Sequence, residues 1–132
     1  MRIPVAVGVV FNEHGQVLVA KRLAHQHQGD CWEFPGGKIE PHENEGQALR
    51  RELFEEVGIV VTHHEAWMKV DHDYDDKSVC LIVHKITGFS GEPVGCEGQE
   101  VKWVLPSALL SLPFPMANHR IVNALQSSLT SD

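Results

Sequence analysis

A helix with separate apolar and acidic faces is the feature that most limits what this chain can fold into. Across residues 45–57, Leu49, Leu53 and Val57 recur at helical spacing, and Gly58 follows where a C-terminal cap is expected. The apolar stripe predicts that the helix packs against a sheet rather than standing alone. The rest of the chain must therefore provide the β-strands for that face.

Two β-branched segments near the start supply the first strands. Residues 3–11 and 17–21 flank a polar turn, so we expect them to form a hairpin. Further strands are expected at residues 32–34, 64–70, 79–86 and 101–104, the middle two joined by a polar turn at 73–77. The Pro-Gly-Gly at residues 35–37 is interpreted as a break in regular structure.

The end of the chain is expected to be helical. Residues 109–112 predict a helical turn, and an apolar stripe over residues 121–129 predicts an amphipathic helix. Strands mixed with two helices predict an α/β domain in which helices pack on a sheet. Because the 132 residues contain no internal repeat or linker-like stretch, a single domain over residues 1–132 is expected.

Composition limits the partners of this chain. A formal charge of -7 disfavours a nucleic-acid polymer as a partner. The apolar run at residues 3–11 is too short to span a bilayer and lacks a cleavage site, so we expect neither membrane association nor a signal peptide. The cysteines show no paired spacing, which indicates reduced thiols in a cytoplasmic protein. We expect all three to be packed as small buried residues. The protein is also expected to be a monomer.

Three carboxylates share one face of the predicted helix. At about 100° per residue, Glu52, Glu55 and Glu56 fall within an arc of roughly 100°. Like charges at this spacing repel one another, unless a cation lies between them. Carboxylate oxygens suit Mg²⁺ or Mn²⁺. The alternative is a solvated acidic face paired with Arg50 and Arg51, and the helix alone leaves both possibilities open.

The residues around the helix form a longer motif. Its fixed positions are Gly37, Glu43, Arg51-Glu52-Leu53, Glu55-Glu56 and Gly58-Ile59. This pattern resembles the signature of the Nudix hydrolase family at every position. The resemblance implies a Nudix fold, which is an α/β/α sandwich with a mixed β-sheet. It also implies hydrolysis of a nucleoside triphosphate with Mg²⁺ as cofactor and Mn²⁺ as its substitute.

The same resemblance implies roles for single residues. The implied metal ligands are the Gly37 carbonyl and the carboxylates of Glu52, Glu55, Glu56 and Glu97. The metals would polarise the phosphates and lower the pKa of an attacking water. Glu52 is the implied base for that water, and Glu55 and Arg51 complete the catalytic group. Glu43 and Arg51 would pair and tie the loop to the helix.

Outside this motif the chain resembles the 8-oxo-dGTP diphosphatase branch of the family. Residues 32–40, 91–93, 97–99 and 114–118 carry this second resemblance. It implies hydrolysis of 8-oxo-dGTP to the monophosphate and pyrophosphate, which protects DNA from mutation. The implied substrate contacts are Arg22, His27, the backbone of Phe34, Lys77 and Asn118.

Asn118 has the chemistry needed to recognise an oxidised purine. Oxidation at C8 turns guanine N7 into a donor, so an amide can accept from N7 while it donates to O6. Ordinary guanine would leave one polar atom of the pair unmatched. The alternative is that Asn118 caps the helix that follows it, and both roles are compatible.

Two other functions remain open at this point. Related small enzymes with a very similar motif act on pyrimidine triphosphates such as CTP or dCTP. A metal-binding or nucleotide-sensing module without turnover would also use such a motif, although the complete set of carboxylates argues against it.

Overall fold

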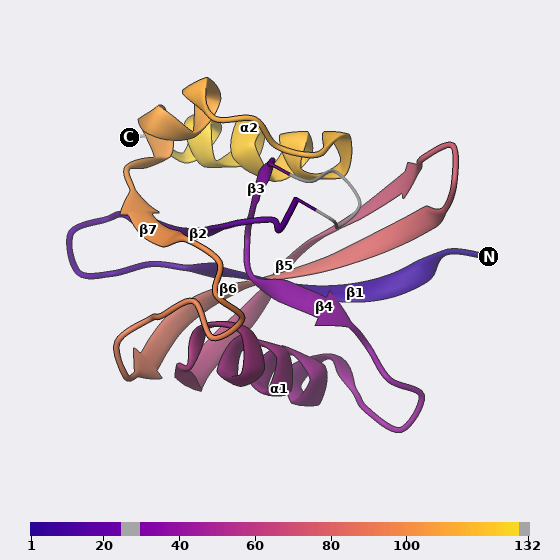
Figure 1. Ribbon diagram of the computed structural model, residues 1–132, viewed down its shortest axis with the longest axis horizontal. Coiled ribbons are helices and arrows are strands. Elements are labelled where there is room, and N and C mark those ends of the chain that lie inside the picture. The colour runs from indigo at the N-terminus through magenta and orange to yellow at the C-terminus, as the bar shows by residue number, and fades with distance from the viewer. Residues whose placement is uncertain (25–29, 130–132) are drawn as a thin grey trace.

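The computed structural model describes residues 1–24 and 30–129, in which the strands lie between two helices (Figure 1). The strands are β1 (Ile3–Val10), β2 (Val17–Lys21), β3 (Trp32–Glu33), β4 (Gly36–Lys38), β5 (Val60–Asp73), β6 (Ser78–Ser90) and β7 (Val101–Val104). The helices are α1 (Glu45–Val57), the 3-10 helices η1 (Pro106–Ser111) and η2 (Met116–Asn118), and α2 (His119–Leu129). Both expected helices are confirmed, and the second begins slightly earlier than its apolar stripe.

Helix α1 is fixed at both ends by its own sequence. Asn44 is the N-cap: its side chain accepts a hydrogen bond from the Gln47 N–H at 2.8 Å, and the Gln47 side chain accepts from the Asn44 N–H at 2.9 Å. At the other end Gly58 adopts the left-handed conformation, with φ of 73°, and its N–H donates to the Phe54 carbonyl. These caps give the acidic residues of α1 defined positions.

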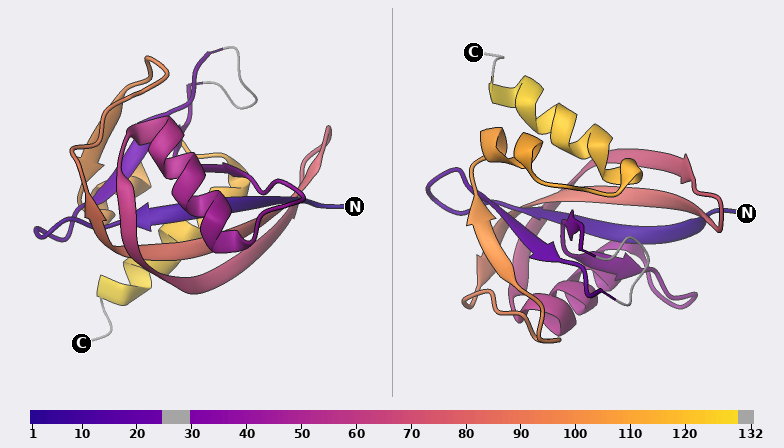
Figure 2. Two further views of the ribbon diagram at one scale, coloured as in Figure 1. Left: turned by 90° about the horizontal axis from the view of Figure 1, so that it is seen from below. Right: turned by 45° about the horizontal axis from the view of Figure 1, so that its top comes forward.

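The strands form two sheets. The order β4-β1-β6-β5 makes a mixed sheet in which β1 runs parallel to β6 and antiparallel to β4. The order β3-β2-β7 makes an antiparallel sheet. Figure 2 shows from two further directions that α1 and α2 lie on opposite sides of the strands. The predicted α/β/α sandwich with a mixed sheet is confirmed.

The expected hairpin between residues 3–11 and 17–21 is wrong in its pairing. Its turn forms, but in the described residues the two segments share a single bridge, from Phe11 to Val17. Strand β6 pairs along the whole of β1, and β4 together with the Pro35 carbonyl occupies the opposite edge. Because β1 has both edges occupied, β2 diverges into the second sheet.

Strand β4 forms where the sequence indicated a break. It pairs with the middle of β1 in an antiparallel register, with Gly37 opposite Ala6. A side chain at Gly36 would overlap the Ala6 carbonyl oxygen, so this close approach requires glycine. The glycines therefore permit the pairing. They also place Gly37, the first fixed position of the Nudix-like motif, alongside β1.

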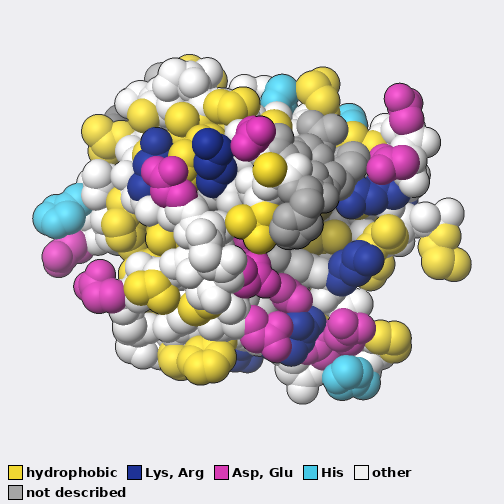
Figure 3. All heavy atoms as spheres, in the orientation of Figure 1, with side chains coloured by type: hydrophobic (Ala, Val, Ile, Leu, Met, Phe, Trp, Pro, Cys, Tyr) yellow, Lys and Arg dark blue, Asp and Glu magenta, His cyan; other side chains and the backbone are white. Residues whose placement is uncertain are grey.

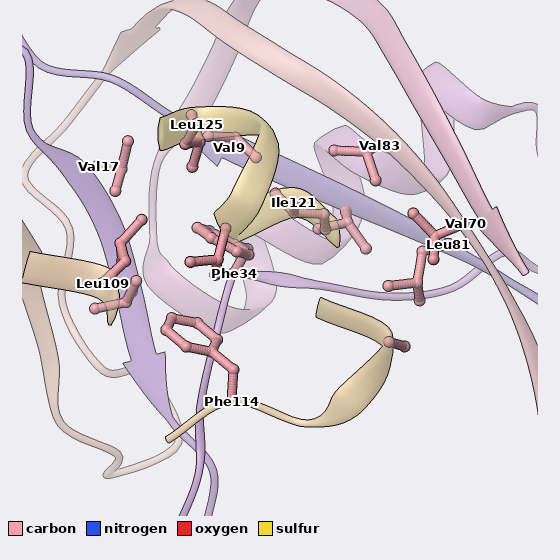
Figure 4. Close-up of a cluster of buried hydrophobic side chains, with 14 of the residues drawn as sticks. Val9, Val17, Phe34, Val70, Leu81, Val83, Leu109, Phe114, Ile121 and Leu125 are labelled. Carbon is pink, nitrogen blue, oxygen red and sulfur yellow. The ribbon is translucent and has the colours of Figure 1, made fainter. Parts of the chain in front are cut away.

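Two buried clusters hold the helices on the strands. On the α2 side, Phe34 stacks on Phe114 with ring centroids 5.3 Å apart, among aliphatic side chains of β1 and β6 (Figure 4). On the α1 side, Leu49, Leu53 and Val57 are completely buried against the strands. Burying each such side chain contributes about 1.5–3 kcal/mol, which anchors the acidic helix.

Strands β5 and β6 are longer than the segments expected at 64–70 and 79–86. Register shifts lie between Val61 and His63, between His63 and His64, and between Ala66 and Met68. Since each irregularity interrupts the two-residue alternation, the sequence pattern reveals only the regular middle of the pair. Beyond it, the Tyr74 N–H donates to the Lys77 carbonyl at 2.7 Å and closes the predicted polar turn.

The expectations for the cysteines are only partly confirmed. The three cysteines are free thiols, as expected, but Cys96 is exposed and Cys31 and Cys80 are only partly buried. The expectation of small buried residues is therefore wrong; the Cys96 loop crosses the surface at the end of α1, to which its backbone is hydrogen-bonded. Within the described ranges, no helix is long and apolar enough to cross a membrane.

Candidate active site

The acidic face of α1 lines a cavity of about 370 Å³. The predicted metal ligands all line it: Gly37, Glu52, Glu55, Glu56 and Glu97. Among the predicted substrate contacts, Arg22, Phe34, Lys77 and Asn118 line it as well. His27 lies outside the described residues. Figure 3 shows acidic side chains gathered in a band over α1 and β4, with basic side chains among them.

The three carboxylates of α1 differ in exposure. The Glu55 side chain is 58% exposed, that of Glu52 is 20% exposed, and Glu56 is buried at 8%. The Gly36 N–H donates to Glu56 Oε2 at 3.1 Å, and a side chain on Gly37 would overlap the Glu52 carboxylate. Strand β4 and helix α1 therefore meet at the carboxylates themselves, which fixes where these groups lie.

Arg51 connects the acidic helix to the loop before it. Its Nε and Nη2 atoms donate to the two oxygens of Glu43 at 2.6 and 2.8 Å. Its Nη1 atom donates to Glu52 at 2.7 Å and to Glu55 at 3.2 Å. The hydrogen bonds from Arg51 lower the pKa of Glu43 to about 2. The predicted Glu43–Arg51 pair is therefore present. Arg51 also pairs with Glu52 and Glu55 on the acidic face of α1, as the alternative of a solvated acidic face predicted.

Burial and crowding make the carboxyl groups of Glu52 and Glu56 difficult to ionise. Burial, and next the charge of Glu33, raise the pKa of Glu56 to about 9. Burial also raises the pKa of Glu52, although the hydrogen bond from Arg51 opposes the shift. Glu97 is close enough to add to both shifts. A positive charge placed among these groups would relieve both the burial penalty and the repulsion.

The donor set suits a hard divalent cation. Carboxylate and carbonyl oxygens are the protein ligands that Mg²⁺ and Mn²⁺ prefer. Within residues 1–24 and 30–129, no three His, Cys, Asp or Glu side chains lie close enough to enclose an ion by themselves. Because Mg²⁺ usually keeps several waters and is held by one or two carboxylates plus phosphate oxygens, an open arrangement fits this ion.

Glu97 reaches the cavity because its loop is fastened to the end of α1. The Glu56 carbonyl accepts from the Cys96 N–H at 3.1 Å and from Gln99 Nε2 at 3.0 Å. Gln99 Oε1 in turn accepts from the Glu97 N–H at 2.9 Å. These bonds satisfy a carbonyl in the last turn of the helix, where no helical partner is available. These hydrogen bonds therefore keep Glu97 of the loop close to Glu56 at the end of α1.

Asn118 and Phe34 contribute to the cavity in different ways. Asn118 is the last residue of η2, directly before α2. Within the part of the chain that the structure describes, its side-chain amide makes no hydrogen bond, so its donor and acceptor are both available in the cavity. Phe34 as a whole residue is only 3% exposed, and its ring belongs to the core. Its backbone is therefore the part that a ligand can contact.

Sequence reasoning missed Glu33, which also lines the cavity. Its carboxylate forms an ion pair with Arg22. Burial raises the pKa of Glu33, and the charge of Arg22 opposes that shift. The two residues come together because Ala20 of β2 lies opposite Glu33 of β3. Since neither strand shows its partner in the sequence, only the pairing register could have revealed this contact.

Comparison with known proteins matches this geometry. The NUDIX domain family matches residues 6–124. The chain is 40% identical to an 8-oxo-dGTP diphosphatase of Haemophilus influenzae, over 93% of this chain and 90% of that protein. It is 32% identical to a CTP pyrophosphohydrolase of Escherichia coli, over 96% of this chain and 94% of that protein. A solved structure from work on MutT of Aliivibrio salmonicida and Vibrio cholerae has 38% identity and a TM-score of 0.84, covering 97% of this chain and 99% of its own.

The layered fold and its carboxylate-lined cavity are those of a class of hydrolases that generally use divalent metal ions. The family match and the similarity over nearly the whole chain then make the assignment particular: this protein belongs to the Nudix hydrolase family. The family and fold that the sequence motif implied are confirmed.

Replacing Arg51 by Lys is expected to lower kcat/KM for nucleotide hydrolysis by about 10–100-fold without loss of helix content. Lysine cannot reproduce the planar fork that holds Glu43, and it cannot contact Glu52 at the same time. Steady-state kinetics and circular dichroism would measure the two effects. Arg50→Lys, on the exposed side of the same helix, is the matched control. Equal activity of the two variants would contradict the orienting role of Arg51.

Proposed function

We propose that this Nudix hydrolase converts 8-oxo-dGTP to the monophosphate and pyrophosphate and so keeps an oxidised base out of new DNA. The observation that carries the proposal is that one cavity is lined both by the α1 carboxylates and by Asn118. The relative from Haemophilus influenzae that bears this activity supports it. We propose further that the protein acts as a cytoplasmic, single-domain monomer.

The carboxylates and the Gly37 carbonyl are the proposed ligands of Mg²⁺, for which Mn²⁺ would substitute. The proposed carboxylate ligands are Glu52, Glu55, Glu56 and Glu97. Bound there, the cations would neutralise the triphosphate and lower the pKa of the attacking water. Arg51 orients two of these carboxylates through Nη1, so they are held in place before substrate arrives.

Glu52 is the proposed general base. Its carboxylate lies against Gly37 and lines the cavity beside the other proposed ligands, where it could accept a proton from the attacking water. The water oxygen forms a bond to the β-phosphorus while its proton passes to Glu52. The bond from that phosphorus to the oxygen bridging to the α-phosphate breaks. The nucleoside monophosphate leaves with the bridging oxygen, and pyrophosphate is the other product.

Asn118 is the proposed selector of the base. Its amide oxygen would accept from the N7–H of 8-oxoguanine, and its NH₂ group would donate to O6. With guanine, the amide oxygen would face an acceptor at N7 and remain unpaired in the cavity, which costs affinity. The Phe34 backbone is the second proposed contact to the base.

Basic residues are proposed for the phosphate side. Arg22 and Lys77 bring positive charge into a cavity whose other charged groups are largely carboxylates. Both would offset the repulsion between those carboxylates and an anionic substrate. His27 stays a predicted contact on the sugar–phosphate side.

A panel of nucleoside triphosphates tests the substrate. Wild-type protein with Mg²⁺ or Mn²⁺ is expected to release pyrophosphate fastest from 8-oxo-dGTP, compared with dGTP, CTP and dCTP. In Asn118→Ala the preference for 8-oxo-dGTP over dGTP is expected to fall about 100-fold, because two matched hydrogen bonds are lost. Asn123→Ala, on the exposed side of α2, is the matched control. An unchanged preference in Asn118→Ala would contradict the assigned role.

A pyrimidine triphosphate is the second candidate substrate. The 32% identity to a CTP pyrophosphohydrolase favours it over other members of the family. If the protein hydrolyses CTP or dCTP faster than 8-oxo-dGTP in the same panel, the pyrimidine triphosphate becomes the proposed substrate. No hydrolysis of any nucleotide with either cation would instead indicate a module that binds without turnover.

A further inference from the structure

The hydroxyl of Tyr74 reaches across from the β5–β6 turn to the segment that carries Asn118. Tyr74 Oη accepts a hydrogen bond from the Ala117 N–H at 2.9 Å. Ala117 directly precedes Asn118 and is only 2% exposed. Because its N–H has almost no access to solvent, the tyrosine hydroxyl replaces the water that would otherwise bind there.

The segment that receives this bond is short. Helix η2 is one 3-10 turn, in which the Asn118 N–H donates to the Pro115 carbonyl at 2.9 Å. A 3-10 turn of this length has weak hydrogen-bond geometry and little rigidity of its own. The bond from Ala117 to Tyr74 therefore adds a fixed point one residue away from the amide that lines the cavity.

Tyr74 is itself held in place from two sides. Its N–H donates to the Lys77 carbonyl at 2.7 Å, and its ring packs edge-on against His72 with centroids 4.5 Å apart. The ring also packs against the core cluster beneath α2. The same turn thus carries Lys77 into the cavity and braces the backbone of η2.

We infer that Tyr74 is a positioning residue for base selection, whose hydroxyl sets the η2 backbone so that the Asn118 amide can separate 8-oxoguanine from guanine. The inference rests on the proposed function. Tyr74 does not line the cavity, so it acts through Asn118 rather than on the substrate. Burial raises the pKa of Tyr74, so its hydroxyl remains neutral throughout the usual assay range, and Tyr74→Phe removes a hydrogen-bond partner without removing a charge.

Tyr74→Phe is expected to lower the preference for 8-oxo-dGTP over dGTP about tenfold, which corresponds to about one net hydrogen bond. The kcat for 8-oxo-dGTP should stay within about twofold of wild type, because the bond removed is to the η2 backbone and the α1 carboxylates are unchanged; the loss therefore falls on KM. Exchange of the Ala117 amide proton, followed by NMR, should accelerate. Val122→Ala is the control, since it removes buried volume from the same layer and leaves this bond intact.

A double-mutant cycle with Asn118→Ala separates positioning from general stability. If Tyr74 acts through Asn118, adding Tyr74→Phe to Asn118→Ala lowers selectivity no further. Two outcomes would overturn the inference: an additive loss in the double variant, or a lower melting temperature in Tyr74→Phe with wild-type selectivity.

The cycle remains decisive if the proposed substrate is wrong. Wild-type selectivity is measured first, and the cycle is then run with whichever triphosphate pair the protein separates best. If no nucleotide is hydrolysed, dissociation constants of the same pair from calorimetry replace kcat/KM. Non-additivity between the two variants supports the role of Tyr74 in each case, and additivity overturns it.

Discussion

Replacing Glu52 by Gln is expected to lower kcat/KM for 8-oxo-dGTP by at least about 1000-fold while the fold remains intact. The substitution keeps the size of the side chain but removes the proposed acceptor of the proton from the attacking water, and such general-base catalysis contributes about 10²–10⁴ in rate. It also removes one carboxylate from the proposed cation site beside Gly37. Single-turnover kinetics at saturating Mg²⁺ would separate the proton-transfer defect from weaker cation binding.

Glu65→Gln provides the control for this experiment. Glu65 is an exposed glutamate on β5, outside the cavity, so the same chemical change there should leave kcat and KM unchanged. Circular dichroism and thermal unfolding would confirm that both variants fold. Activity of Glu52→Gln within tenfold of wild type would assign the base to another residue.

Replacing Glu56 by Gln is expected to have the largest effect on stability and on cation binding. The folded protein raises the pKa of Glu56 from 4.5 to about 9, so it binds this proton more tightly than the unfolded chain does. The resulting stabilisation is complete below about pH 4 and is lost as the pH rises toward 9. Without cations, Glu56→Gln should therefore be more stable than wild type at pH 8, by on the order of a few kcal/mol, and nearly equal to it at pH 4.

Cation binding by the wild type should strengthen as the pH rises, whereas the stabilisation from protonated Glu56 weakens. Because a carboxylate must be ionised to bind Mg²⁺ or Mn²⁺, binding to the wild type should release a proton and strengthen as the pH rises. Glu56→Gln should bind Mn²⁺ about 100-fold more weakly and release fewer protons than wild type, because the share that comes from Glu56 is lost. Calorimetry in buffers of different ionisation enthalpy measures this release, with exposed Glu92→Gln as the control. Proton release by Glu56→Gln equal to that of wild type would rule out Glu56 as its source.

Helix α1 could be predicted from the sequence because the information that defines it is local. Its apolar stripe, its three carboxylates and Gly58 all lie within one short segment. The same holds for β7, whose bounds match the expected strand at residues 101–104. Where a short segment decides the structure, periodicity and capping residues are sufficient.

The errors arose where distant segments compete for the same partner. Residues 3–11 and 17–21 look like a hairpin when considered alone, but β4 and β6 occupy both edges of β1. The glycines at residues 36–37 are compatible with a break in regular structure and with a strand that packs closely against β1. The local sequence does not distinguish these two structures. The β5–β6 register shifts likewise depend on the partner strand.

The candidate site divides in the same way. The carboxylates of α1 follow from helical spacing, whereas the placement of Glu97, Lys77 and Asn118 beside them came from family resemblance. The Glu33–Arg22 pair and the bond from Ala117 to Tyr74 join segments far apart in the chain. Neither contact has a local signal, so only the folded arrangement reveals them.

The parallel pairing of β1 with β6 also determines when this enzyme can begin to work during its synthesis. The first strand waits for residues 79–86 before its second edge is covered, and such non-local pairing slows folding relative to helical domains. During synthesis, the residues of α1 are added well before those of β6. If Asn118 selects the base as proposed, selective hydrolysis begins only after residue 118 has left the ribosome, and a nascent chain that stops earlier carries the proposed metal ligands of α1 without the proposed selector.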